Sequence, residues 1–187
     1  MKKVLGLIIA ASFATSALAV DSYSIDQSHT FPSFEINHLG FSTQRGRFNK
    51  TSGKIILDRA AKTGSIEVSI DAASIDTGLE ELHKHLKAED FFDVAQYPTL
   101  NFKSNKLKFD GEQVVAAEGE LTLRGVTKPV SLKVEAFKCA IHPMNKKSMC
   151  GANVVTTIKR SDFGMSKYVP AVGDEVKIAI QIEAVKD

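Results

Sequence analysis

Residues 176–183 read Val-Lys-Ile-Ala-Ile-Gln-Ile-Glu. Apolar side chains recur at every second position, with Ala179 as the exception among the polar ones between them. This pattern is typical of a strand that turns one face to a core and the other to water. The same alternation recurs in residues 33–37, 66–71, 120–124 and 130–135. About eight to ten such strands predict an all-β fold, an antiparallel barrel or sandwich, rather than alternating strands and helices.

Four glycine-containing stretches are typical of turns between such segments, namely Asp110-Gly111, Thr51-Ser52-Gly53, Thr63-Gly64 and Val172-Gly173-Asp174. We expect the chain to reverse direction at each of them. No linker or fixed repeat divides the sequence, so residues 20–187 are expected to form a single domain of ordinary size.

One segment departs from the strand pattern. Thr77 and Glu80 have the spacing of a capping box, which predicts that a helix begins at Thr77. Leucines then recur at helical spacing, at Leu79, Leu82 and Leu86. We therefore expect one short amphipathic helix near residues 78–88, lying against the barrel or across one of its ends. A second helical turn is expected at residues 90–94.

The N-terminus predicts export from the cytoplasm. Lys2 and Lys3 precede an apolar run from residue 4 to residue 14, and Ala17-Leu18-Ala19 resembles a cleavage box. Together these are typical of a secretory signal peptide comprising residues 1–19. A membrane anchor is the alternative, but the run is shorter than the ~20 residues that a membrane span needs. We expect cleavage after Ala19, a periplasmic location and no transmembrane segment in the mature chain.

Charge gives little indication of a polyanionic partner. Loss of Lys2 and Lys3 brings the formal net charge from +2 to zero, and no run of like charge stands out. Nucleic acid is therefore not an expected partner.

The chain has two cysteines, Cys139 and Cys150. In an oxidising compartment a pair this close usually forms a disulfide. Such a bond would close a short loop and contribute roughly 3 kcal/mol through loop-closure entropy. A metal or redox pair is the alternative, although the spacing is not that of a C-x-x-C motif.

No motif in the sequence predicts catalysis. It lacks a G-x-S-x-G nucleophile elbow and a glycine-rich loop for nucleotide phosphates. The histidines lack the usual spacing of metal ligands, because His83 and His85 would face different sides of a helix. We therefore expect no catalytic residues, no catalytic cofactor and no metal site.

Longer motifs carry a family resemblance. They are, in chain order, Tyr23-Ser24-Ile25-Asp26-Gln27-Ser28-His29-Thr30, Asn37-His38-Leu39-Gly40, Arg45-Gly46-Arg47-Phe48, Ile70 to Gly78, His85 to Asp93, Tyr97-Pro98, Leu121 to Val130, and Arg160-Ser161-Asp162-Phe163-Gly164-Met165. Together they resemble the YceI-like family of bacterial secreted proteins, over essentially all of residues 21–185. The stretch from Cys139 to Cys150 departs from the simpler turn of many relatives.

The resemblance implies a lipocalin-like antiparallel β-barrel with a long apolar tunnel. Such a protein would bind or carry a polyisoprenoid, or an isoprenoid quinone such as ubiquinone-8, and would not be an enzyme. A barrel of about eight strands is either packed with side chains or holds one ligand. The alternative is therefore a filled barrel in an envelope stress protein that acts through partners. An edge strand left by imperfect closure could also support a homodimer.

Alternation and resemblance together suggest which side chains would contact the ligand. The expected tunnel wall comprises Phe34, Ile36, Phe48, Ile66, Val68, Ile70, Leu100, Phe102, Leu121, Leu123, Ile158 and Phe163. Polar contacts at the mouth are expected from His29, Asn37, His38, Arg160 and Asp162. The wall residues could equally form a packed core, and Arg160 and Asp162 could instead pair at a barrel end.

Overall fold

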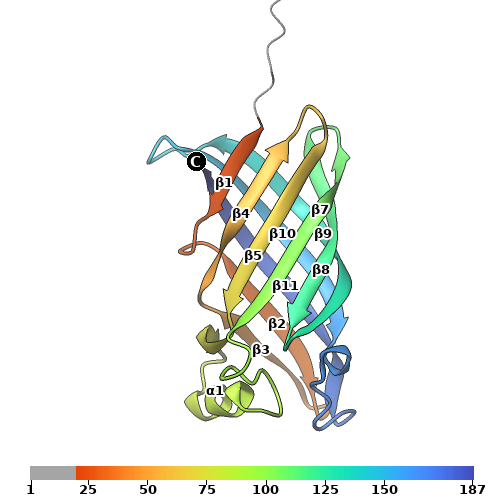
Figure 1. Cartoon of the computed structure of the whole chain (residues 1–187). Helices are drawn as coiled ribbons and strands as arrows, with labels where there is room; N and C mark the ends of the chain where they lie inside the picture. The colour runs from red at the N-terminus through yellow and green to blue at the C-terminus, as the bar shows by residue number, and fades with distance from the viewer. Residues whose placement is uncertain (1–19) are drawn as a thin grey trace, which may run out of the picture.

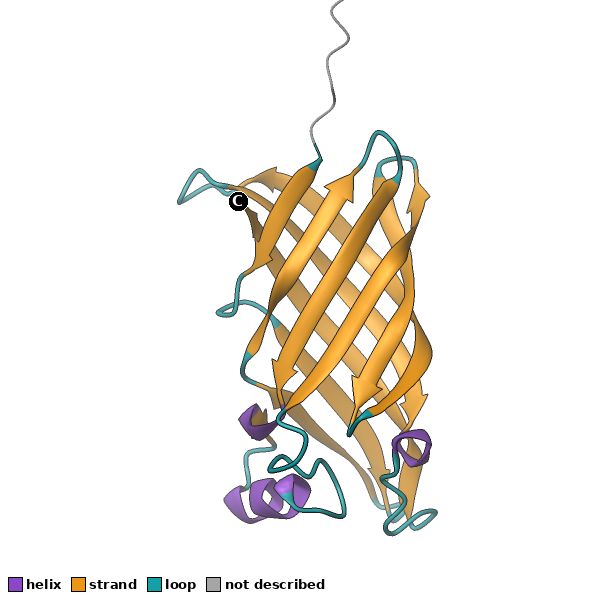
Figure 2. Ribbon diagram, viewed as in Figure 1, coloured by secondary structure: helices purple, strands orange, loops and turns teal. Residues whose placement is uncertain are grey.

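The computed structural model describes residues 20–187 (Figure 1). The predicted signal peptide, residues 1–19, lies outside the described residues, so its cleavage stays a prediction. Within the described chain, strands dominate and short helices gather at one end (Figure 2).

The described chain contains eleven strands in one antiparallel sheet. They are β1 (Asp21–Ile25), β2 (Phe31–His38), β3 (Ser42–Phe48), β4 (Thr51–Asp58), β5 (Thr63–Asp71), β6 (Ile75–Asp76), β7 (Thr99–Asp110), β8 (Gln113–Leu123), β9 (Val126–Ile141), β10 (Ser148–Lys159) and β11 (Val172–Lys186). The helices are α1 (Glu80–Lys87) and the 3₁₀ turns η1 (Ala72–Ser74) and η2 (Arg160–Phe163).

The sheet closes into a barrel because β1 pairs with β4 on one side and with the end of β11 on the other. Eight strands complete the ring: β1, β4, β5, β7, β8, β9, β10 and β11. In the earlier part of β11, residues 172–181 pair with β2 instead of β1, and β3 pairs with β2. The predicted antiparallel barrel of about eight strands with one short helix is confirmed.

Closure is less complete beside β3. This strand pairs with β6 through only two residues, Arg47 and Phe48. Residues 42–46 have no second strand partner in the part of the chain that the structure describes. This is the kind of edge on which the predicted homodimer depends, and the dimer itself stays a prediction.

Three of the four predicted turns do not lie where they were expected. The chain reverses at Asp110-Gly111, between β7 and β8. Thr63-Gly64 and residues 172–174 instead begin β5 and β11, directly after the turns, and Gly53 lies inside β4. A Cβ on Gly53 would come within 2.1 Å of the Glu67 carbonyl oxygen, and its φ is +152°. Glycine is therefore required here by the close approach of β4 to β5 rather than by a turn.

The helix begins later than predicted. The N-cap position of α1 is Leu79, without a side-chain cap, so the capping box from Thr77 to Glu80 does not form. Instead the Thr77 backbone N–H donates to His83 Nε2 at 2.7 Å, which turns the chain before the helix. Residues 90–94 form hydrogen-bonded turns rather than a helix, and Asp93 has φ +45°.

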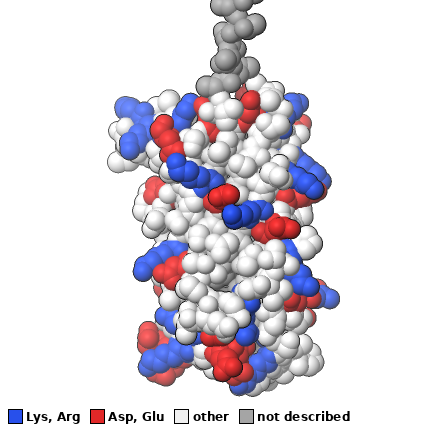
Figure 3. All heavy atoms as spheres, viewed as in Figure 1, with Lys and Arg blue, Asp and Glu red and all other residues white. Residues whose placement is uncertain are grey.

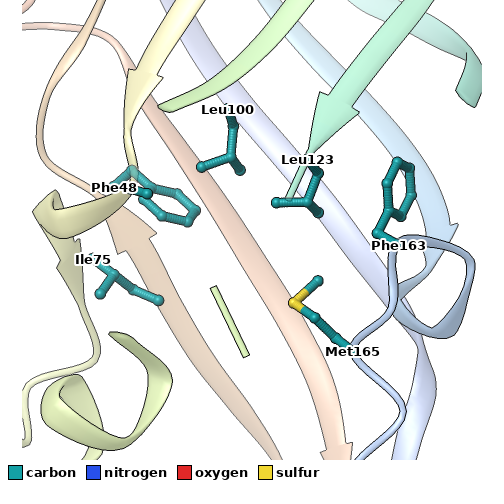
Figure 4. Packing of buried hydrophobic residues seen from close by; sticks show 7 residues of the cluster. Phe48, Ile75, Leu100, Leu123, Phe163 and Met165 are labelled. Carbon is teal, nitrogen blue, oxygen red and sulfur yellow. The ribbon is translucent and has the colours of Figure 1, made fainter. Parts of the chain in front are cut away.

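Two separate apolar clusters lie toward opposite ends of the barrel. The helix-end cluster contains Phe48, Ala72, Ile75, Leu100, Leu123, Phe163 and Met165, and its side chains converge from strands and loops (Figure 4). The far-end cluster contains Tyr23, Leu57, Val114, Cys150 and Ala184. Because buried packing is concentrated in these two clusters, the middle of the barrel is left to the site described next.

The far end also carries the disulfide. Cys139 and Cys150 are directly opposite each other in the β9–β10 ladder and are bonded, as predicted. The hairpin beyond them projects from the end of the barrel opposite α1 (Figure 2).

Candidate ligand cavity

A cavity of about 620 Å³ lies inside the barrel, within the usual range of small-molecule sites, ~300–1,000 Å³. Its wall is made mostly of aliphatic and aromatic side chains from every strand of the ring. This volume excludes the predicted alternative of an interior filled by side chains.

The burial pattern of β11 shows why the interior is hollow. Val176, Ile178, Ile180 and Ile182 all line the cavity, yet each is only half-buried. Inward side chains in a close-packed core would be fully buried. Here their inner surfaces instead face empty space, which an apolar ligand would cover.

Most of the predicted wall residues line this cavity. They are Phe34, Ile36, Phe48, Ile66, Val68, Ile70, Leu100, Phe102, Leu121, Leu123 and Ile158. Phe163 does not line it. Strand β10 ends at Lys159, so the inward alternation stops there, and Phe163 packs in η2 as a member of the helix-end cluster. Whether the lining residues touch a ligand stays a prediction.

The cavity opens only at the helix end, as far as residues 20–187 show. The exposed residues among those that line it are all at that end: His38, Gln44, Arg45, Leu79, His85 and Tyr168. At the far end the lining residues are buried or half-buried, including Tyr23, Leu57, Val114, Phe137 and Cys150. The site is therefore a tube with one mouth.

Two of the five predicted polar contacts line the cavity, His38 and Arg160. His29 lies instead in the β1–β2 loop, where its Nδ1 is 2.8 Å from Asp26 Oδ2. Asn37 Oδ1 accepts the Gly40 N–H at 3.0 Å and so shapes the β2–β3 turn. Asp162 is exposed in η2.

Arg160 is 4% exposed and organises the loop before β11. Its guanidinium donates to the backbone carbonyls of Met165, Lys167, Val172 and Gly173. Burial lowers the pKa of Arg160 from its usual value, although a guanidinium remains charged at any ordinary pH. Four of its five N–H groups are thus occupied by the protein, which leaves one for a ligand.

Sequence reasoning missed several polar residues at the mouth, chiefly Gln44, Arg45, Thr77 and His85. Two signals could have indicated them. Gln44 is in phase with Phe48 along β3, two inward positions before it. His85 follows Leu82 by three residues on α1, which places both side chains on one side of the helix.

One group of residues has the geometry of a possible cation site. Ligand atoms of Asp26, His29 and Glu183 lie within 4.8 Å of one another. The Asp26 carboxylate also accepts from the Ser28 backbone N–H and Oγ. These hydrogen bonds, together with that to His29, hold the pKa of Asp26 down at about 2. These hydrogen bonds show that the cluster stabilises the β1–β2 loop, and none of its three residues lines the cavity.

On the face shown in Figure 3, acidic and basic side chains are intermixed. Cross-strand pairs such as Lys108 with Glu118 and Lys103 with Glu67 recur along the barrel wall. None of the helices within residues 20–187 has the length and apolar character needed to cross a membrane.

Comparison with known proteins identifies relatives over the whole length of this fold. Residues 23–184 match the family model of the YceI-like domain. Protein YceI of Escherichia coli O157:H7 is 35% identical over 190 residues, which cover 99% of this chain and 98% of that protein. A UPF0312 protein of Pseudomonas aeruginosa (strain LESB58) is 33% identical over 192 residues, which cover 100% and 99%.

Solved structures share the architecture. BcnA of Burkholderia cenocepacia superposes with a TM-score of 0.73 at 26% identity, over 85% of this chain and 98% of BcnA. A domain from Saccharophagus degradans, described as polyisoprenoid-binding and implicated in plant cell wall breakdown, superposes with a TM-score of 0.66 over 88% of this chain and 98% of its own. Its 17% identity indicates a common fold.

Proposed function

Since this chain belongs to the YceI-like family, we propose that it is a periplasmic binding or carrier protein for a long apolar lipid and not an enzyme. The ligand we propose is a polyisoprenoid or an isoprenoid quinone such as ubiquinone-8. The proposal depends chiefly on one observation, the apolar tube with a single mouth whose lining side chains are half-buried rather than packed. The polyisoprenoid-binding description of the Saccharophagus degradans domain supports the same class of ligand.

The physical chemistry of the tube suits a long hydrocarbon tail. Each CH₂ that leaves water contributes about 0.8 kcal/mol, so several isoprene units give tight binding with few polar contacts. Polar side chains are concentrated where a headgroup would remain, at His38, Gln44, Arg45 and His85. We therefore expect the tail to lie in the tube and the headgroup at the mouth.

The test is native mass spectrometry of the purified mature protein, followed by organic extraction and identification of the lipid. We expect a bound species whose fragments show an isoprenoid ladder. If the protein is isolated empty and remains so after incubation with isoprenoid quinones and polyprenyl phosphates, the carrier function is wrong.

A variant with a blocked tube sharpens this test. Ile178→Trp adds volume from the middle of β11 into the cavity, so we expect it to lose the bound lipid. Gln181→Trp adds the same side chain on the outer face of the same strand and should keep the lipid. Equal lipid content in the two variants would place the ligand elsewhere.

The periplasmic location has its own test. The mass of the protein released by osmotic shock should correspond to a chain that begins at Val20, because Ala17-Leu18-Ala19 supplies the cleavage box. Recovery of the uncleaved chain in the cytoplasmic fraction would contradict the location without bearing on lipid binding.

A further inference from the structure

We propose that the mouth end of the barrel docks on a lipid bilayer, so that a ligand passes between bilayer and tube without crossing water. This inference depends on the proposed lipid-binding function and adds to it the surface from which the ligand comes.

The mouth end exposes four large apolar side chains. Phe41 is 90% exposed, Leu79 57%, Tyr168 52% and Leu39 50%. They come from three segments: the β2–β3 turn, the start of α1 and the loop between η2 and β11. We call these four residues the apolar rim.

The apolar rim is continuous with the cavity wall. Leu79 and Tyr168 themselves line the cavity. Leu39 follows His38, another lining residue, and its N–H donates to the Ala171 carbonyl at 3.0 Å. That bond ties the β2–β3 turn to the loop that holds Tyr168. Tyr168 in turn stacks near His85 of α1, with ring centroids 6.2 Å apart.

This continuity favours a bilayer over a protein as the partner. A long isoprenoid tail that leaves the tube through water would expose its whole apolar surface. Apolar side chains around the mouth that insert into the acyl boundary would give the tail an unbroken apolar path.

The charges at this end favour docking through apolar contact rather than attraction to anionic lipids. Lys167 pairs with Asp90, Lys84 with Glu81 at 3.1 Å, and Arg45 with Glu35 at 2.8 Å. Acidic and basic side chains are intermixed at this end of the face shown in Figure 3. Vesicles of neutral lipids should therefore suffice, with little dependence on salt.

The chain offers a matched control at its other end. Ile141 and Met144 are 63% and 85% exposed on the projecting β9–β10 hairpin, beside Lys146 and Lys147. That surface has comparable apolar exposure but surrounds no opening. It is the alternative docking surface that the experiment must exclude.

The experiment uses the full mature protein, freed of lipid, and vesicles of phosphatidylcholine and phosphatidylethanolamine that contain ubiquinone-8. Vesicle flotation measures docking, and the quinone acquired by the protein measures transfer. We expect the double variant Leu39→Ser and Phe41→Ser to reduce flotation and the transfer rate about tenfold or more, from the lost apolar insertion. The double variant Ile141→Ser and Met144→Ser should match the unmodified protein in both.

Thermal melting checks that each variant folds, and ubiquinone-8 supplied in detergent measures binding without a bilayer. Unchanged flotation of the Leu39 and Phe41 variant would overturn the docking proposal, as would a loss confined to the Ile141 and Met144 variant. If no protein takes up the quinone from detergent, the carrier function fails, while the flotation result still decides whether the mouth end docks on bilayers.

Discussion

The carboxylate of Asp187 joins parts of the barrel that are far apart in sequence. The Asp187 side chain accepts from Ser22 Oγ at 2.5 Å, Ser24 Oγ at 2.6 Å and Lys54 Nζ at 3.1 Å. It thereby ties the chain after β11 to β1 and β4. These hydrogen bonds lower the pKa of Asp187 from 3.8 to about 2, the bond from Ser22 being the largest cause.

The stability of the fold should therefore depend on pH in the acidic range. Because the folded pKa lies below the unfolded one, the ionised carboxylate stabilises the fold above about pH 4, and this contribution is lost as the pH falls from about 4 to about 2. We expect Asp187→Asn to melt at a lower temperature than the unmodified protein at neutral pH and to converge with it near pH 2. Glu67→Gln, an exposed carboxylate with one lysine partner at 3.5 Å, is the control. A constant difference at all pH values would refute the linkage.

At the residue level, sequence reasoning located the wall of the site better than its mouth. Ile66, Val68 and Ile70 were predictable because a strand fixes the side of every second residue. The carbonyl partners of Arg160 and the position of His29 outside the cavity were not predictable, because they depend on how loops fold back on the chain. Sequence alternation also could not separate a hollow barrel from a filled one, since both need apolar inward faces.

Among the elements, the long β9–β10 hairpin shows how a covalent bond extends a strand pair beyond the barrel. The disulfide joins residues eleven apart, near the far-end apolar cluster that includes Cys150. By contrast, the helix boundary was mispredicted because the Thr77 N–H donates to His83 rather than to the Glu80 side chain, as a capping box would require. The imidazole of His83 therefore has the role that the capping pattern assigned to the Glu80 side chain.

We expect replacement of both cysteines, Cys139→Ala with Cys150→Ala, to lower the free energy of unfolding by about 3 kcal/mol, through the restored freedom of the unfolded loop. Urea denaturation monitored by circular dichroism measures this difference. A reducing agent should bring the unmodified protein close to the variant while leaving the variant unchanged. An unaltered midpoint in the variant would show that β-ladder pairing alone fixes this hairpin.

For the whole molecule, the far-end cluster sets the depth of the tube. Phe137 lines the closed end and packs against this cluster, whereas Phe109 packs against it without lining the cavity. We expect Phe137→Ala to deepen the tube and to shift the preference toward longer isoprenoid alcohols in a competition series of defined chain lengths. Phe109→Ala should lose stability to a similar degree with no such shift. A shared shift in both variants would indicate general loosening rather than a depth limit.

The closed end also limits how a lipid ligand can enter and leave the tube. A blind tube cannot serve as a conduit, because nothing that goes in can emerge on the opposite side. A lipid that enters the tube tail first must leave through the same mouth, with its headgroup first. Net movement of lipid therefore requires the loaded protein itself to travel, so that this barrel would act as a shuttle between two surfaces and never as a bridge that joins them.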